Sequence, residues 1–340
     1  AADGKTALML ACRHDSAALV SELVKAGAPV NVQDRKGRTA LIHACASRQQ
    51  HVAQVLLRLN ADLDIQDKSG ASALMVAIRM RCIPIVKQLL SSGAALDQVS
   101  GDGKTALICA SQYSRLACRL LVDRGADPNQ AVDGGQTALM VASAHQPKAV
   151  RYLVAAGGDV DARDGEGLTA LMHAARAGQL GAVRILIEKG KAPLDTCDAD
   201  GWTALMHACH LPRPRPSHPS SALTLQGCNQ RLEIVRGLIH AGADVLHASA
   251  SQGETAFTVL LSARKHHAVR DFKSVLQQMG HVLSSAARTT FDLAKKRKRL
   301  ASEPGEHDEE DRDRIPARMR MVALDGSQVR AGSGRDPAAV

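Results

Sequence analysis

The sequence contains very few aromatic residues. Phe, Trp and Tyr together make up 2% of its 340 residues. A β-sandwich or β-barrel fills its core with large side chains, so this composition argues against those folds. It suits thin layers of helices that pack through Ala, Leu, Val and Met.

Long apolar runs are also absent. No run approaches the roughly 20 residues that a transmembrane helix needs, and we expect no membrane association. The first four residues, Ala1 to Gly4, lack Met and any signal-peptide pattern. Because the chain enters a repeat at once, we expect it to be a piece of a longer chain.

The cysteine pattern argues against a disulfide-bonded protein, and the charge distribution does not favour a nucleic-acid-binding protein. The eight cysteines form no CxxC pair. Cys12, Cys45 and Cys209 occupy one repeat position that elsewhere holds a small residue, which indicates buried thiols in a reducing compartment rather than disulfides. The net charge of +9 is spread along the chain, so it does not favour nucleic acid as the partner.

The sequence is instead rich in internal repetition. A Thr-Ala-Leu-Met tetrad recurs every 32–34 residues, with one spacing of 52, and becomes degenerate in its last two copies. The copies begin at Thr6, Thr39, Ser72, Thr105, Thr137, Thr169, Thr203, Thr255 and Thr289. A Gly or Asn lies 12 or 13 residues before most of the later copies, at Gly27, Asn60, Gly93, Gly125, Gly157, Gly190 and Gly242.

Each element of the repeat predicts local structure. The Thr or Ser before an apolar run predicts a helix N-cap. A second, amphipathic helix follows, and the Gly or Asn is expected to end it in the left-handed conformation. Asp-x-x-Gly segments such as Asp34–Gly37 then predict a turn that projects between repeats.

This unit resembles the ankyrin repeat, which has about 33 residues and opens Thr-Pro-Leu-His. The resemblance covers residues 2–301, as eight repeats and a terminal half-repeat. It implies a mainly α fold, an ankyrin-repeat α-solenoid of stacked helix-turn-helix units with β-hairpin fingers. We expect residues 302–340 to form a disordered charged tail.

The chain departs from the family pattern at two positions. Ala replaces Pro at the first helical position, and Met or Ile replaces His at the fourth. We therefore expect the Thr–His hydrogen bond of the family to be absent and apolar packing to replace it. His43, His173 and His207 lie one position later and are not expected to take that role.

The 52-residue spacing indicates an insertion at about residues 211–230, which is rich in Pro and Arg. Within it, Arg213, Pro216 and Pro219 match the R-x-x-P-x-x-P spacing that Src-homology-3 domains recognise. A flexible loop insertion is the competing interpretation, and the sequence does not decide between them.

A basic run near the C-terminus also has two interpretations. It consists of Lys295, Lys296, Arg297, Lys298 and Arg299. The run resembles a nuclear localisation signal. It also suits a solvated helix end, where the helix dipole favours cations.

The resemblance implies that a partner protein binds along the concave surface of fingers and inner helices. Candidate contacts are a basic group in the first three repeats, an acidic group with the single Trp in repeats 6 and 7, and one Tyr in repeat 4. They are Arg35, Lys36, Arg38, Lys68, Arg79, Tyr113, Asp164, Glu166, Asp200 and Trp202. Ordinary charged surface is the alternative. Asn31 and Asn129 each follow a Leu by eight positions, and they resemble the ankyrin asparagines that are hydroxylated in animals.

We therefore expect a non-enzymatic, monomeric scaffold or adaptor that binds protein, located in the cytoplasm, the nucleus or both. No catalytic constellation stands outside the repeat pattern, and we expect no cofactor, metal or small-molecule substrate. One alternative is a nuclear regulator associated with transcription or chromatin. Another is the substrate-recognition part of an enzyme whose catalytic domain lies outside this chain.

Overall fold

The computed structural model describes residues 3–132, 134–210, 225–249, 253–260, 278 and 280–289. The chain divides into two compact units, Ala1–Ala287 and Arg288–Val340. The helices labelled α1 to α14 below all lie in the first unit. No helix among the described residues has both the length and the apolar character needed to cross a membrane.

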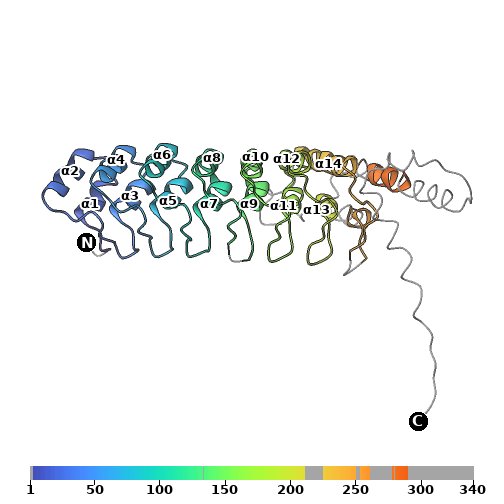
Figure 1. The fold of residues 1–340 in the computed structure, drawn as a ribbon, viewed down its shortest axis with the longest axis horizontal. Helices are drawn as coiled ribbons and strands as arrows, with labels where there is room; N and C mark the ends of the chain where they lie inside the picture. Colours follow the sequence, from blue (N-terminus) through green and yellow to red (C-terminus); the bar gives the residue numbers. More distant parts are fainter. Residues whose placement is uncertain are drawn as a thin grey trace, which may run out of the picture. The chain divides into compact units, whose positions relative to one another are not determined.

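The first unit is a stack of helix pairs (Figure 1). Odd-numbered helices form one row, which we call the inner helices, and even-numbered helices form the outer row. Loops project from the side of the inner row. The pairs are α1 (Ala7–Ala11) with α2 (Ala17–Lys25), α3 (Ala40–Ala46) with α4 (Gln50–Arg58), α5 (Ala73–Arg79) with α6 (Ile83–Ser91), α7 (Ala106–Tyr113) with α8 (Arg115–Asp123), α9 (Ala138–His145) with α10 (Pro147–Ala155), α11 (Ala170–Arg176) with α12 (Leu180–Glu188), and α13 (Ala204–Cys209) with α14 (Leu225–His240). Residues 256–260 and 280–289 are also helical.

The repeated Thr or Ser begins each inner helix, as predicted. In seven repeats its hydroxyl accepts a hydrogen bond from the backbone N–H three residues later, for example Thr39 from Ile42 and Ser72 from Met75. Each such cap contributes about 1 kcal/mol. Thr203 is the exception, because its side chain makes no capping hydrogen bond.

The Gly or Asn after each outer helix adopts the predicted left-handed backbone in most repeats. Asn60 has φ 56° and Gly93 has φ 85°. In repeat 6 the left-handed residue is Lys191, with φ 52°, one position after the predicted Gly190. The longer spacing to the next tetrad, 13 residues instead of 12, accommodates this shift.

The core follows the predicted substitution of the family's His. The fourth position of the tetrad, which is the third residue of the helix, is held by Met9, Ile42, Met75, Ile108, Met140, Met172 and Met206, and each of these side chains is about 1% exposed. Cys12, Cys45 and Cys209 are fully buried, as expected. Burial raises the pKa of the Cys12 and Cys209 thiols to about 12, so both stay protonated and unreactive at neutral pH.

The fingers between repeats are tight turns, and the described residues contain no strand. In the second finger, residues 34–38, Gly37 N–H donates to the Asp34 carbonyl at 2.8 Å. Successive fingers are joined by single backbone hydrogen bonds, such as Lys68 N–H to the Lys36 carbonyl at 2.9 Å and Gly101 N–H to the Ser69 carbonyl at 2.7 Å. The fingers are therefore hairpin-shaped turns tied to one another, and no β-ladder is present among these residues.

Two regions near the C-terminal end differ from the predicted layout. The last part of the predicted insertion, residues 225–230, is helical and lengthens α14 to 16 residues. Residues 280–289 form a helix where the repeat spacing would place a finger before Thr289. The rest of the predicted half-repeat and the predicted tail lie outside the described residues, so the count of repeats stays a prediction.

Arg231 on α14 connects three parts of this end of the stack. Its side chain is buried, and it donates to the Arg176 carbonyl at the end of α11 at 2.6 Å. It also donates to the carbonyls of His207, Ala208 and His210 around the end of α13, at 3.1–3.3 Å. These carbonyls are left unpaired by their own helices.

In other repeats a glutamine makes part of this connection. Gln49 donates to the Arg13 carbonyl, and Gln179 donates to the Ala144 carbonyl, each linking one repeat to the end of the previous inner helix. Arg231 makes the corresponding link across the insertion. The sequence pattern did not predict this role, because the insertion removes Arg231 from the repeat register.

The substitution Arg231→Met should destabilise the first unit by about 2–4 kcal/mol, because it leaves several buried carbonyls without a donor. The measurement is urea unfolding followed by circular dichroism. Arg236→Met is the matched control, since Arg236 lies on the same helix and is exposed in a pair with Glu233. Equal effects of the two substitutions would contradict the role of Arg231.

A second prediction concerns the close approach of neighbouring fingers. Gly70 and Gly93 both have positive φ, so Ala costs about 1–2 kcal/mol of backbone strain at either position. A Cβ at Gly70 would lie 2.3 Å from Gly101 N, whereas a Cβ at Gly93 would meet nothing within 4 Å. Gly70→Ala should therefore cost about 1–3 kcal/mol more than Gly93→Ala in the same unfolding measurement. Similar losses would show that contact between these fingers contributes little.

Candidate partner-binding surface

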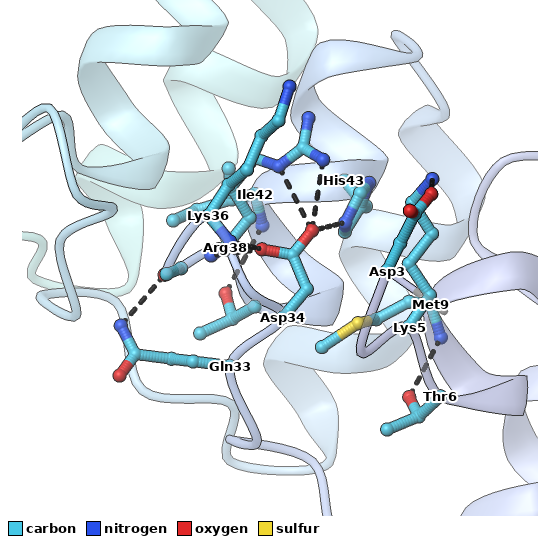
Figure 2. Close-up of polar contacts among 12 residues, drawn as sticks. Asp3, Lys5, Thr6, Met9, Gln33, Asp34, Lys36, Arg38, Ile42 and His43 are labelled. Carbon is cyan, nitrogen blue, oxygen red and sulfur yellow. Dashed lines mark hydrogen bonds and ion pairs between the residues drawn. The ribbon is translucent and has the colours of Figure 1, made fainter. Parts of the chain in front are cut away.

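The second finger is held against its inner helix by one buried carboxylate (Figure 2). Asp34 Oδ1 accepts from the backbone N–H groups of Lys36 and Arg38 at 2.8 and 2.9 Å. Its Oδ2 accepts from the Arg38 guanidinium at 2.9 Å and lies 3.0 Å from His43 Nε2. Burial alone would raise the Asp34 pKa, but the hydrogen bonds from Arg38, His43 and Lys36 outweigh it and hold the pKa well below its usual range.

The same pairing of a finger Asp with an inner-helix His recurs in repeats 6 and 7. His173 Nε2 lies 2.7 Å from Asp164 Oδ2, and His207 Nε2 lies 2.8 Å from Asp198 Oδ2. These Asp–His contacts add to the apolar packing of the buried Met and Ile side chains, and the sequence analysis did not predict them. The constant spacing of nine residues between Asp and His was the signal available in the sequence.

Burial acts on these histidines as well. It lowers the pKa of His43 and His207, although the partner carboxylates act in the opposite direction. Both imidazoles are therefore neutral at pH 7, and Nε2–H donates to the aspartate. The hydrogen bond from the inner-helix His to the Asp at the finger base therefore holds each of these two fingers against its own helix.

We call the finger tips and the exposed side of the inner helices the finger face. Of the predicted basic contacts, Arg35 and Lys36 are exposed on the second finger, Lys68 is exposed on the third, and Arg79 is exposed at the end of α5. Arg38 differs, because its half-buried guanidinium is bonded to Asp34.

The predicted acidic contacts also separate into two kinds. Glu166 and Asp200 are exposed at the tips of the sixth and seventh fingers. Asp164 lies at the base of the sixth finger, where its side chain is only 9% exposed and holds that finger to His173. Contact of Asp164 with a partner stays a prediction, and the geometry gives its carboxylate an internal role.

The two predicted aromatic contacts are half-buried rather than fully exposed. Trp202 packs its ring against His207 and His210, with ring centroids 5.4 and 5.5 Å apart. Tyr113 ends α7 and is also half-buried. Trp202 therefore presents part of a ring that is already held in place.

Asn31 and Asn129, the predicted hydroxylation sites, are exposed and connect repeats. The side-chain oxygen of Asn31 accepts from Asp62 N–H at 3.0 Å, and that of Asn129 accepts from Asp159 N–H at 2.7 Å. Their modification stays a prediction. The proline motif at Arg213, Pro216 and Pro219 and the basic run Lys295–Arg299 lie outside the described residues.

Within the described part of the chain, no three His, Cys, Asp or Glu side chains gather in a way that could hold a metal ion. The Asp–His pairs are therefore best understood as structural. Each is saturated by contacts within its own repeat.

The depressed histidine pKa values predict acid sensitivity. In the folded state His43 and His207 resist protonation, so the unfolded state binds these protons first. Their contribution to stability is present above the unfolded pKa of about 6.5 and is lost as the pH falls below it. We expect the free energy of unfolding to fall between pH 7.5 and 5.5. The fall should be smaller in the His43→Gln/His207→Gln variant, measured by urea unfolding at each pH.

The exposed His51→Gln on α4 is the control for this measurement, and it should keep the wild-type dependence on pH. An unchanged pH dependence in the His43→Gln/His207→Gln variant would contradict the assignment.

Comparisons with known proteins agree with this architecture. A search of curated protein sequences found no match. A chain from the structure of a predatory endopeptidase of Bdellovibrio bacteriovorus in complex with an immunity protein is 25% identical, with a TM-score of 0.50, over 55% of this chain and 99% of that chain. An ankyrin repeat domain from Acinetobacter baumannii AYE is 27% identical, with a TM-score of 0.51, over 54% and 97%.

The ankyrin repeat domain of human ASB11 is 22% identical, with a TM-score of 0.55, over 71% of this chain and 99% of that chain, and this likeness shows the fold alone. A family model described as ankyrin repeats in three copies matches residues 1–67, 58–132, 74–164 and 139–215. These matches cover more than half of the sequence, and the chain belongs to the ankyrin repeat family.

Proposed function

We propose that this chain is a non-enzymatic scaffold or adaptor that binds a partner protein along its finger face. Ankyrin repeats are protein-binding modules, and one of the similar chains comes from a structure of a protein complex. The partner, its position on the finger face and a monomeric state are parts of this proposal.

The observation that carries the proposal is a set of unused charges on the finger face. Among the described residues, Arg35, Lys36, Lys68 and Arg79 are exposed and take part in no ion pair. The cations that serve the fold, such as Arg38 and Lys104, are instead paired within their own fingers. Charges that are not needed for folding are available to a partner.

These charges also vary along the stack. The fingers and inner-helix ends of repeats 2 and 3, residues 34–49 and 67–82, carry a basic excess. Their charged residues are Arg35, Lys36, Arg38, Arg48, Lys68, Arg79 and Arg81 against Asp34 and Asp67. The corresponding parts of repeats 6 and 7, residues 164–179 and 198–210, carry an acidic excess of Asp164, Glu166, Asp198 and Asp200 against Arg176. An acidic segment of the partner fits over repeats 2 and 3, and a basic segment fits over repeats 6 and 7.

The test compares two charge reversals of equal size. Arg35→Glu/Lys36→Glu alters the finger face, and Arg58→Glu/Lys87→Glu alters exposed cations on the outer helices α4 and α6. Quantitative crosslinking and mass spectrometry should show partners recovered roughly tenfold less by the first variant, since reversing two exposed charges costs about 1–2 kcal/mol. The second variant should recover them as wild type does. Equal recovery by both variants would contradict the finger face as the binding surface.

A second proposal concerns location. The run Lys295–Arg299 supports nuclear import and, with it, a regulatory partner in the nucleus. A tagged chain should then lose nuclear accumulation when Lys295, Lys296 and Lys298 are changed to Gln. A tagged chain that stays cytoplasmic with or without these lysines would contradict nuclear import and leave the cytoplasmic scaffold as the proposal.

The repeats would act as a substrate-recognition part only if a catalytic domain is joined to them.

A further inference from the structure

A hollow of about 430 Å³ opens on the finger face between the fifth finger, residues 132–136, and the sixth finger, residues 164–168. Its size is near the lower end of sites that hold small ligands, which is about 300–1,000 Å³. It therefore suits one side chain better than a folded element.

The hollow lies where Gly134 leaves one finger tip without a side chain. Gly134 occupies a position that other fingers fill with Lys36, Ser69, Asp102, Glu166 and Asp200. A Cβ at Gly134 would meet nothing within 4 Å, so the missing side chain leaves open space. Gly165 N–H donates to the Gly134 carbonyl at 2.6 Å, which fixes the two tips against each other.

The floor of the hollow is the Asp164–His173 pair. Asp164 Oδ1 accepts from the backbone N–H groups of Glu166 and Leu168, at 3.0 and 2.8 Å, and Oδ2 is bonded to His173. The oxygens of Asp164 are thus already engaged. Asp164 therefore contributes its negative charge to the hollow, but both of its oxygens already accept hydrogen bonds.

The rim carries one carboxylate and one guanidinium that remain accessible. Glu166 Oε2 lies 3.6 Å from Arg176 Nη1, and the two side chains are 75% and 59% exposed. An exposed pair at this separation adds little to stability, so a competing group can open it. Both rim charges are therefore available to an incoming side chain.

The surrounding charges decide which sign the hollow prefers. Two lining carboxylates, Asp164 and Glu166, outweigh the one lining cation, Arg176. Outside the lining, Asp198 and Asp200 of the seventh finger exceed the one nearby cation, Arg163, whose guanidinium donates to the Cys197 carbonyl. Carboxylates that line one concave region produce a negative potential there. The lining includes no Phe, Tyr or Trp that would favour an apolar guest.

We propose that this hollow receives one basic side chain, Arg or Lys, from an extended segment of the partner, and that Glu166 pairs with it. The proposal rests on the proposed binding of a partner to the finger face. It names the side chain that reaches repeats 5 and 6.

The repeat spacing fixes where the acidic part of the same segment lies. The hollow is about three repeats from the basic fingers that carry Lys36 and Lys68, and neighbouring helices pack about 8–10 Å apart. Three repeats therefore span about 24–30 Å, which an extended segment covers in about eight residues at 3.3 Å each. The partner segment has its acidic residues about eight positions from the basic residue.

The first experiment probes the hollow alone, in the full chain. N-acetylarginine methylamide and N-acetylglutamate methylamide are titrated to about 100 mM, since single side chains bind in the millimolar range or more weakly. Amide NMR spectra should show shifts at Gly134 and Gly165 with the arginine probe. Glu166→Gln should weaken that binding about threefold to fivefold, and Arg176→Gln should strengthen it, because it removes the competing cation.

Glu22→Gln is the matched control, because Glu22 is also an exposed carboxylate paired with a cation, Lys25, but lies on α2. It should bind the arginine probe as wild type does. Shifts produced by the glutamate probe and removed by Arg176→Gln would overturn the proposal. So would the absence of shifts at the hollow with both probes.

The two proposals fail in different ways. If Arg35→Glu/Lys36→Glu loses the partner but Glu166→Gln keeps it with unchanged affinity, the finger face binds the partner and the assignment of the hollow is wrong. If the arginine probe binds at the hollow and neither variant affects the partner, the hollow takes a basic side chain but the partner binds elsewhere.

Discussion

A pair of short helices cannot bury its own apolar face, so each repeat of this chain depends on the repeats beside it. The inner helices have five to eight residues, well below the roughly 12–15 at which an isolated helix becomes even marginally stable. Side chains such as Leu41, Leu74 and Leu107 are about 1% exposed only because neighbouring repeats cover them. Stability is therefore close to a sum over neighbouring pairs, and a change at one interface leaves distant repeats intact.

The polar contacts within the fingers follow from that stacking. Each finger must turn sharply next to its neighbour, and its backbone groups need partners close at hand. Asp34, Asp164 and Asp198 supply these at the finger base, where they bond to backbone N–H groups and to an inner-helix His. Because the Asp at the base already satisfies the backbone N–H groups of the finger, the side chain at the tip is not needed for the fold. The side chain at one tip position is Lys36, Asp102 or Glu166 in different fingers without change of fold, so the tips can carry the specificity.

The sequence predicted what is determined within one repeat. N-caps such as Thr39 and buried apolar residues such as Met75 depend on a few adjacent positions, and the periodic pattern shows them directly. The Asp34–His43 pair was missed although the nine-residue spacing recurs, because the spacing shows a contact only once the fold of the finger back onto the helix is known. Arg231 was missed for a stronger reason: its partners lie 21–55 residues away, across an insertion that breaks the register. The sequence predicted which charged residues lie on the finger face. It did not show that some of them, such as Arg38 and Asp164, are already paired within their own repeats.

The finger face offers a partner two kinds of contact: exposed charges, and half-buried rings with a hollow. Exposed tips such as Arg35 and Lys68 act through water, where attraction is screened beyond about 8 Å at physiological salt. Such charges accelerate encounter and disfavour a partner whose charges run in the opposite direction, but they add little to affinity. Affinity needs groups that lose water on binding, and on this face those are the half-buried rings of Tyr113 and Trp202 and the hollow beside Glu166. Under the proposed function, the charge difference along the stack orients the partner, and the two rings and the hollow in repeats 4 to 7 supply the contacts that hold it.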